Sequence, residues 1–424
     1  MQTAVDELVV KGTKAREASR ALAKLPSQVK DQALANVADG LKARQEEILA
    51  ANESDCRAGR RNGLSDANLG RLVLDPERLD ALADDVRRVA ALPDPVGETF
   101  DMRTLPNGLT AGRRRVPLGV IGAIFESRPN VTIDIAVLCL KSGNAVILRG
   151  GKEAVQSNTV LAALVRDSIS IAGVPKEAVQ FVESTDRALV GQMLKMKEHI
   201  DLIIPRGGAE LVRRVASEAA MPAITGGIGV CHIYVDGAAD VDMAVDIACD
   251  AKLSRPYACN ALDTLLVHSD IAPAVLPQLA TRWAAAGVEL HGDSRTLSIL
   301  GNVDGLRALP ATEDDWGTEF LSLTAAVKIV DTLDQALEYI DTYGSGHTEA
   351  IVSEDYSAAM RFLDQVDSGV VIVNASTCFN DGAQLGLGAE VAISTNKMHA
   401  RGPMGLKELT SYKWTVLGTG QVRG

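Results

Sequence analysis

The stretch "NAVILRGGKEAVQSN" (144–158) passes from an apolar run into two glycines, a lysine and an amphipathic segment. Continuous apolarity rich in Val and Ile predicts a strand buried on both faces, and residues 152–172 have the spacing of a helix. A strand that ends in a glycine turn and is followed by a helix is typical of a parallel sheet with crossover helices. The stretch therefore favours an α/β fold.

The same alternation continues on both sides of this stretch. Further strands are predicted at 116–125, 179–184, 200–205 and 230–236, with helices near 187–198, 208–220 and 240–251. After Cys259 it begins again, with strands near 264–268, 325–331, 348–353 and 369–374 and helices near 271–287, 332–343 and 355–366. The chain is thus predicted to contain two α/β units. The Gly-rich residues 382–405 and the tail 409–424 fit neither unit and favour an arm or interface segment.

The N-terminal region is predicted to form two helices separated by Pro26 and Ser27. Ser27 is expected to cap the second helix, whose apolar positions run from Val29 to Ile48 at helical spacing. These helices are expected to pack against the sheet that follows them.

Composition excludes several classes of partner. The 424 residues carry a formal net charge of -12, which argues against general affinity for nucleic acid or anionic membranes. No apolar run of about 18 residues exists to span a bilayer, and the first residues lack the pattern of a secretory signal. We expect a soluble cytoplasmic protein. The six cysteines form no CxxC pair and the histidines form no HExxH, so we expect free thiols and no metal site.

Two glycine turns with cations are candidate sites for a nucleotide. Gly150, Gly151 and Lys152 follow one predicted strand, and Arg206, Gly207 and Gly208 follow another. Such turns offer backbone N–H groups, a helix dipole and a positive charge to phosphate oxygens. An ordinary tight turn explains either one alone, whereas two together favour a nucleotide pocket.

Two further segments carry groups that suit reaction chemistry. Arg128 and Asn130, in "IFESRPNVT" (124–132), offer a guanidinium and an amide donor, although a plain helix start explains this segment better when it is taken alone. Cys259 lies in a polar loop shortly after Arg255, which favours the nucleophilic thiolate; the alternative is a core thiol without a chemical role.

The ordered blocks "RRRVPLGVIGAIFESRPNVT", "LCLKSGNAVILRGGKEA", "IDLIIPRGG", "CNALDTLLVH" and "FNDGAQLGLGAEVAIST" carry a resemblance over nearly the whole chain. The chain resembles the γ-glutamyl phosphate reductases (glutamate-5-semialdehyde dehydrogenases), a family of the aldehyde dehydrogenase superfamily. The resemblance implies NADPH-dependent reduction of L-glutamyl 5-phosphate to L-glutamate 5-semialdehyde with release of phosphate, in proline biosynthesis. It implies an aldehyde dehydrogenase-like fold with a Rossmann-type cofactor domain, an α/β catalytic domain and a small oligomerisation arm.

The resemblance also implies roles for single residues. Cys259 falls on the catalytic nucleophile and forms a thioester, with Asn130 as our candidate oxyanion donor. Cofactor binding is expected from residues of two strand ends and one loop, namely Arg149, Gly150, Gly151, Lys152, Arg206, Gly207, Gly208 and Glu319. Arg128 and Arg255 are the candidates for anionic groups of the substrate.

Two departures from the pattern bear on the chemistry. Hydrolytic aldehyde dehydrogenases carry a glutamate base where this chain has Ile224, in "ITGG" (224–227), and isoleucine cannot activate water. The thioester is therefore expected to be resolved by hydride. Cys378 stands where the family is expected to carry arginine, which removes either a cation for an anionic ligand or a structural ion pair. A hydrolytic or CoA-acylating aldehyde dehydrogenase and a catalytically silent scaffold are the alternatives.

The resemblance implies the following domain boundaries: cofactor-binding segments at 1–125 and 145–253, an oligomerisation segment at 126–144, a catalytic domain at 254–395 and an oligomerisation arm with the tail at 396–424. A homo-oligomer and functional coupling to glutamate 5-kinase are expected, because the acyl phosphate is labile.

Overall fold

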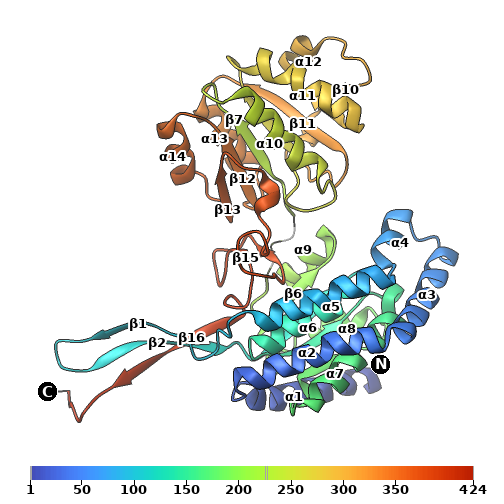
Figure 1. Ribbon diagram of the computed structural model, residues 1–424, viewed down its shortest axis with the longest axis vertical. Helices are drawn as coiled ribbons and strands as arrows, with labels where there is room; N and C mark the ends of the chain where they lie inside the picture. The colour runs from blue at the N-terminus through green and yellow to red at the C-terminus, as the bar shows by residue number, and fades with distance from the viewer. Residues whose placement is uncertain (1, 225, 227, 424) are drawn as a thin grey trace. The chain divides into compact units, whose positions relative to one another are not determined.

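The structure, a computed structural model, describes residues 2–224, 226 and 228–423 (Figure 1). The chain forms two compact units. Unit 1 comprises Met1–Thr225, Leu387–Ala392 and Met404–Gly424, and unit 2 comprises Gly226–Gly386 and Ile393–Pro403. The division follows residue 225, whereas the sequence placed a division near residue 254. The predicted α/β fold is confirmed.

Unit 1 begins with a helical layer. Its helices are α1 (Gln2–Leu22), α2 (Ser27–Ala43), α3 (Gln45–Arg61), α4 (Asp66–Leu72) and α5 (Pro76–Ala91), followed later by α6 (Asn130–Lys141), α7 (Val155–Ile171), α8 (Ala188–Met193) and α9 (Ala209–Glu218). Helix α1 packs on strands of the sheet, while α2, α3 and α5 pack on α6 and α7. Apolar side chains at helical spacing, such as Leu34, Val37 and Leu41, are fully buried in these contacts.

The predicted start of α2 needs a correction. Pro26 occupies the N-cap position, so Ser27 is already helical, and its hydroxyl donates to Asp94 Oδ2 (2.9 Å) rather than capping the helix. The helix also ends at Ala43, which places Ile48 in α3.

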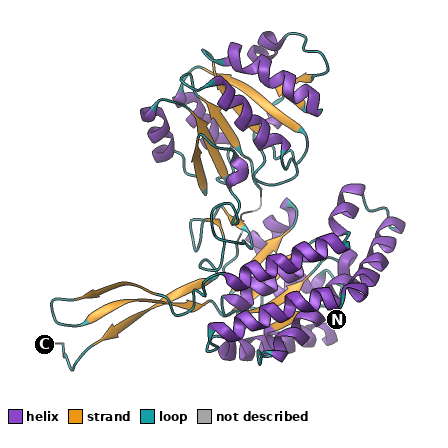
Figure 2. Cartoon of the chain, in the orientation of Figure 1, coloured by secondary structure: helices purple, strands orange, loops and turns teal. Residues whose placement is uncertain are grey.

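The sheet of unit 1 is parallel, with strand order β5-β4-β3-β6. Its strands are β3 (Val120–Phe125), β4 (Ala145–Arg149), β5 (Val179–Phe181) and β6 (Leu202–Arg206). The single strand predicted at 116–125 is broken, because Pro117 ends β2 and Gly119 has a φ of +128°. Helices cover the strands of this sheet on both sides (Figure 2).

A three-stranded antiparallel sheet extends unit 1. It consists of β1 (Thr99–Thr104), β2 (Thr110–Pro117) and β16 (Thr410–Leu417), with β2 in the centre. Strands β2 and β16 pair over their whole length, from Thr410 opposite Pro117 to Leu417 opposite Thr110. Several of its apolar side chains are exposed, including Trp414, Val416 and Leu417.

Unit 2 contains a seven-stranded parallel sheet with strand order β10-β9-β11-β8-β7-β12-β13. The strands are β7 (His232–Val235), β8 (Thr264–His268), β9 (Glu289–Gly292), β10 (Arg307–Pro310), β11 (Thr324–Val330), β12 (Thr348–Val352) and β13 (Val370–Val373). The helices are α10 (Val241–Leu253), α11 (Ala272–Ala286), α12 (Ser294–Leu300), α13 (Leu333–Tyr343) and α14 (Tyr356–Gln365). A two-stranded pair, β14 (Ile393–Ser394) and β15 (Gly402–Pro403), completes the unit.

Two cores hold this sheet. Leu265 and Val267 of β8 contribute to a core with Trp283 of α11, while Leu266 contributes to a core with Phe362 of α14. This alternation buries both faces of β8, as expected for a parallel sheet.

Strand β7 lies in a different sheet from the one predicted. The sequence placed residues 230–236 with the first α/β unit, but β7 pairs with β8 and β12 of unit 2. Hydrophobicity marks a buried strand without indicating its neighbours, which explains the difference.

Candidate active site

Three predicted segments meet at one edge of the sheet of unit 1. Strand β3 lies between β4 and β6, and all three are parallel, so their carboxyl ends share an edge. Residues 126–130 follow β3, residues 150–152 follow β4, and residues 207–208 follow β6. The structure therefore brings together the two glycine turns and the "ESRPN" segment.

Two glutamates that sequence reasoning missed bind the turns at this edge. Glu126 Oε2 accepts the N–H of Gly208 (2.9 Å), directly before α9. Glu153 Oε1 accepts the N–H (2.7 Å) and hydroxyl (3.0 Å) of Ser127, whose φ is +54°. The available signal was their position, since Glu153 directly follows Lys152 and Glu126 directly follows the predicted strand at 116–125.

Arg149 is the most buried cation at this edge. Burial lowers the pKa of its guanidinium, and Nη2 donates to the carbonyl of Thr185 (3.4 Å). Its Nε is buried without a hydrogen-bond partner among the described residues. Lys152 is exposed and Arg206 is partly exposed. The edge thus presents one guanidinium with spare hydrogen-bonding capacity and two accessible cations.

Arg128 and Asn130 lie at the start of α6. Arg128 is exposed, and Asn130 is the first helical residue. Asn130 Nδ2 donates to Asp134 Oδ2 (2.8 Å), one turn later. Burial raises the pKa of Asp134 to about 6 despite this hydrogen bond. A primary amide has two N–H groups, so Asn130 retains a second donor.

The Cys259 loop lies in unit 2 between α10 and β8. The Cys259 side chain is partly buried, and the Cys231 thiol donates to its carbonyl oxygen (3.1 Å). A side chain at Gly229 would place its Cβ 1.9 Å from the same oxygen. The backbone of Gly229 therefore packs directly against Cys259 and requires glycine there.

Side-chain contacts hold both flanks of this loop. Asn260 Nδ2 donates to the carbonyls of Asn380 (3.0 Å) and Cys378 (3.3 Å). Arg255 forms an ion pair with Asp381 (3.3 Å) and is largely exposed. The loop that carries Cys259, the candidate nucleophile, is thus held by side-chain contacts on both sides of this residue.

Glu319 is linked to the Cys259 loop through Gly229. Its Oε1 accepts the N–H of Gly229 (2.9 Å), and burial raises the pKa of its carboxyl. The contact joins residues 90 positions apart in the sequence. It places the Glu319 carboxyl beside the backbone segment that packs on Cys259.

A buried polar cluster of Cys231, Lys252, Asp263 and His347 supports the same segment and was not predicted. Asp263 accepts the N–H groups of Cys231 (3.2 Å) and Phe320 (3.0 Å), and burial raises its pKa to about 7. Lys252 donates to the carbonyl of Leu262 (2.7 Å), and burial lowers its pKa to about 8.

His347 completes this cluster. Its Nδ1 lies 2.7 Å from Thr348 Oγ1 and 3.7 Å from Cys231 Sγ. Burial lowers the pKa of His347 to about 4.

Ile224 and Cys378, the two positions at which the sequence departs from the expected pattern, lie in different surroundings. Ile224 is buried, and its N–H donates to the carbonyl of Ile203 (2.9 Å), while Thr225 and Gly227 of the same motif lie outside the described residues. Cys378 is partly buried, accepts from Ser254 Oγ (3.4 Å) and contacts the carbonyl of Ala251 (3.7 Å). Its thiol therefore lies against the last turn of α10.

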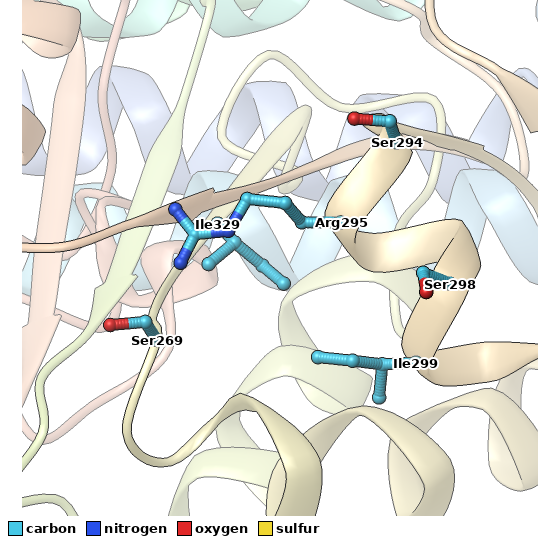
Figure 3. A pocket seen from close by; sticks show the side chains of 6 residues that line it. All are labelled: Ser269, Ser294, Arg295, Ser298, Ile299 and Ile329. Atoms are coloured by element: carbon cyan, nitrogen blue, oxygen red, sulfur yellow. The ribbon is translucent and has the colours of Figure 1, made fainter.

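A shallow pocket of about 330 Å³ in unit 2 contains none of the predicted site residues (Figure 3). Its one charged side chain, Arg295, is paired through two nitrogens with Asp331 (2.7 and 3.0 Å). This pocket has no part in the candidate site.

Residues 2–224, 226 and 228–423 contain no group of three His, Cys, Asp or Glu side chains that could hold a metal ion. Among these residues, none of the helices is long and apolar enough to cross a membrane.

Known proteins match this chain over its whole length. Residues 3–297 match the aldehyde dehydrogenase family. The chain is 58% identical over 424 residues to a gamma-glutamyl phosphate reductase of Dehalococcoides mccartyi (strain CBDB1), covering 100% of both chains. It is 53% identical to that of Roseiflexus castenholzii (strain DSM 13941 / HLO8), covering 97% of this chain and 98% of the relative.

Solved structures also resemble this chain over nearly its whole length. The gamma-glutamyl phosphate reductase of Thermotoga maritima has a TM-score of 0.95 and 44% identity, covering 99% of this chain and 100% of that chain. An acetylating aldehyde dehydrogenase from Geobacillus thermoglucosidasius, 17% identical with a TM-score of 0.71, covers 100% of this chain and 99% of that chain and shares the fold.

Proposed function

The chain belongs to the aldehyde dehydrogenase family and, within it, to the gamma-glutamyl phosphate reductases, and from this premise we propose that it reduces L-glutamyl 5-phosphate to L-glutamate 5-semialdehyde with NADPH. The chain is an oxidoreductase of this family. The proposed reaction releases phosphate and serves proline biosynthesis from glutamate.

The observation that carries the proposal is the fixed loop around Cys259. The loop keeps a partly exposed thiol next to backbone held by Gly229, Cys231 and Asn260. In the proposed step the Cys259 thiolate attacks the acyl carbon, and the bond between that carbon and the phosphate oxygen breaks. Phosphate leaves with the bonding electrons, and a thioester remains on Cys259.

The carboxyl edge of unit 1 fits the nicotinamide cofactor. Arg149 has an unpartnered buried Nε among the described residues, and Lys152 and Arg206 are accessible beside glycine turns. We assign Arg149, Lys152 and Arg206 to the anionic and ribose groups of the cofactor, and Gly150, Gly151, Gly207 and Gly208 to close approach of its phosphates. Glu319 is assigned to the nicotinamide ribose. When bound, NADPH supplies the hydride that converts the thioester to the aldehyde.

Oxyanion stabilisation is assigned to the backbone N–H of Cys259 and to the side chain of Asn130. The second N–H of the Asn130 amide is available for this contact while the first donates to Asp134. Arg128 and Arg255 are assigned to the anionic groups of the substrate, because both guanidinium groups are exposed.

Ile224 favours reduction over hydrolysis. A thioester persists only when no base activates water against it, and a buried isoleucine cannot act as a base. The Glu319 carboxyl, which is assigned to the nicotinamide ribose, accepts a hydrogen bond from the Gly229 N–H.

We further assign cofactor binding to unit 1, catalysis to unit 2, and oligomerisation to the sheet of β1, β2 and β16. Strands β1 and β2 replace the segment 126–144 in this assignment, because that segment contains α6, whose side chains are mostly buried. Exposed Trp414, Val416 and Leu417 support the assignment of the sheet to a homo-oligomer. Functional coupling to a glutamate 5-kinase and a cytoplasmic location belong to the same proposal, because a labile acyl phosphate favours use close to where it is made.

The reverse reaction tests the proposal against its alternatives. Glutamate 5-semialdehyde and NADP should yield NADPH only when inorganic phosphate is added, because phosphate is the acceptor of the acyl group. Reduction of NADP without phosphate would instead identify a hydrolytic dehydrogenase, and dependence on CoA would identify an acylating one. No turnover with either nicotinamide cofactor would identify a silent scaffold.

A further inference from the structure

A cavity of about 820 Å³ lies in unit 1 outside the candidate active site. The end of α1, the base of β2, the segment Val96–Gly97 and Lys413 of β16 line it. Its wall includes Gly119, which directly precedes β3, whereas the proposed cofactor residues follow the carboxyl ends of the same strands. The cavity therefore lies toward the amino ends of the strands, away from the proposed cofactor residues.

The end of helix α1 and the turn that follows it place a row of cations along this cavity. Arg16 and Arg20 lie four residues apart on one side of α1, and Lys24 follows in the turn after the helix. All three residues line the cavity. The described lining residues include no Asp or Glu. In a chain of net charge -12, this concentration of positive charge is a local exception.

The antiparallel strands add two opposed cations. Arg114 of β2 pairs directly with Lys413 of β16 in the strand register, and both line the cavity. Directly opposite side chains on neighbouring strands lie on the same face, and like charges in this arrangement destabilise the pair. An anion between them would remove that repulsion.

Neighbouring carboxylates neutralise only part of this charge. Arg16 Nη1 donates to Asp201 Oδ2 (2.5 Å), which also accepts the N–H of Val120 (2.7 Å). Arg115, which also contributes to the wall, pairs with Glu98 (3.0 Å).

Four cations remain, namely Arg20, Lys24, Arg114 and Lys413, and none of these has an ion pair or side-chain hydrogen bond among the described residues. The carbonyl groups at the C-terminal end of α1 carry partial negative charge, which explains why Arg20 and Lys24 are placed near them. This helix end does not explain the placement of Arg114 and Lys413, which belong to strands β2 and β16.

We propose that this basic cavity binds a small phosphate-bearing anion that carries at least two negative charges. Its volume lies in the range of small-molecule sites, about 300–1,000 Å³. Two arginine forks and two lysine ammonium groups from three chain segments suit several phosphate oxygens at once. The site does not depend on the proposed reaction.

Isothermal titration calorimetry of the full chain in low-salt buffer tests this site, with inorganic pyrophosphate and ATP as probes and citrate as a carboxylate comparison. A triple variant, Lys24→Gln, Arg114→Gln and Lys413→Gln, removes three unpaired charges. The control, Lys14→Gln, Arg71→Gln and Lys176→Gln, removes the same charge from exposed positions of unit 1 that do not line the cavity. A third protein, Lys152→Ala with Arg206→Ala, reports binding at the proposed cofactor edge.

The expected result is phosphate binding that weakens roughly tenfold or more in the cavity variant, since three contacts of the size of surface ion pairs are lost. The control and the cofactor-edge variant should bind pyrophosphate as the unmodified chain does. The single variants Arg114→Gln and Lys413→Gln give the same comparison with less change, should the triple variant fold poorly. Absence of binding to the unmodified chain, or equal weakening in the control, would overturn the proposal; citrate binding as tightly as pyrophosphate would overturn its phosphate preference.

Discussion

Gly229 and Cys259 form the tightest backbone contact of the candidate site. A Cβ at position 229 would lie 1.9 Å from the carbonyl oxygen of Cys259 and 3.0 Å from its Cβ. The same glycine donates its N–H to Glu319. One residue therefore sets the distance between the nucleophile loop and the segment that carries Glu319.

Gly229→Ala should disturb both stability and catalysis. The new methyl group meets backbone that cannot rotate away, so the free energy of unfolding should fall by about 2 kcal/mol. Displacement of the Cys259 loop should lower kcat/KM by about a hundredfold. Urea unfolding and steady-state kinetics measure the two effects.

Gly70→Ala is the matched control for this substitution. Gly70 lies in α4 with open space around it, so alanine should raise helix stability by about 0.5–1 kcal/mol and leave kinetics unchanged. Wild-type activity in Gly229→Ala would show that the contact does not position the loop.

His347 predicts a dependence of stability on pH. Its folded pKa, about 4, is depressed from the ordinary 6.5, so the unfolded chain binds more protons between these values. Stability therefore falls as pH decreases from about 6.5 to 4, by up to about 3 kcal/mol from this group. His347→Gln should remove this component, which denaturant unfolding across the pH range measures. His268→Gln, at a partly exposed position, should keep the wild-type slope; an unchanged slope in His347→Gln would contradict the assignment.

Sequence reasoning at this scale selects candidate groups by the chemistry of their own side chains. The positions of Cys259, Lys152 and Arg206 follow from local patterns and the family resemblance. The contact between Gly229 and Glu319 joins residues 90 positions apart, and no local pattern encodes it. Glu126 and Glu153 were missed because the search for a phosphate site looked for cations, whereas these carboxylates bind the turn and loop backbone.

At the scale of elements, parallel strands place the candidate cofactor residues on one edge. The order β5-β4-β3-β6 puts the turns after β4 and β6 on either side of the segment after β3. Two loops distant in sequence thereby share one ligand site in the proposed function.

Lys152→Ala and Arg206→Ala should each raise the KM for NADPH roughly tenfold, because each removes a charge-assisted contact to the cofactor. The value of kcat should change little, since neither side chain is assigned to the reacting atoms. Lys176→Ala removes an exposed lysine before β5 and serves as the control. Unchanged KM values in both variants would remove the cofactor from this edge.

The strand pattern was predictable where strands are continuously apolar. The residues of β8 were predicted in full, and β4, β6, β11, β12 and β13 within a few residues. The short strands β9 and β10 were missed because "ELHG" and "RALP" are mixed in polarity and one ends in proline. The sheet to which β7 belongs depends on tertiary pairing, which hydrophobicity does not report.

At the scale of the whole molecule, the sheet of β1, β2 and β16 is the surface assigned to the proposed homo-oligomer. Trp414, Val416 and Leu417, all on β16, are 54%, 56% and 63% exposed. Large apolar side chains exposed in this way favour a protein interface.

Val416→Lys with Leu417→Lys should reduce the assembly to a single chain of 44.8 kDa, because lysine disfavours burial between copies. Size-exclusion chromatography with light scattering measures the mass. Tyr356→Lys, at an exposed position of α14, should leave the assembly intact. A monomeric unmodified chain would contradict the assignment of this sheet to oligomerisation.

The most direct test of the central claim is NADPH oxidation in a coupled assay with glutamate, ATP and a glutamate 5-kinase. The unmodified chain should oxidise NADPH only when all three are present, and Cys259→Ala should lower the rate at least about a thousandfold. Cys378→Ala, the matched change at the other partly buried thiol, should retain activity. Oxidation that persists in Cys259→Ala, or none in the unmodified chain, would contradict reduction of an acyl phosphate through a thioester on Cys259.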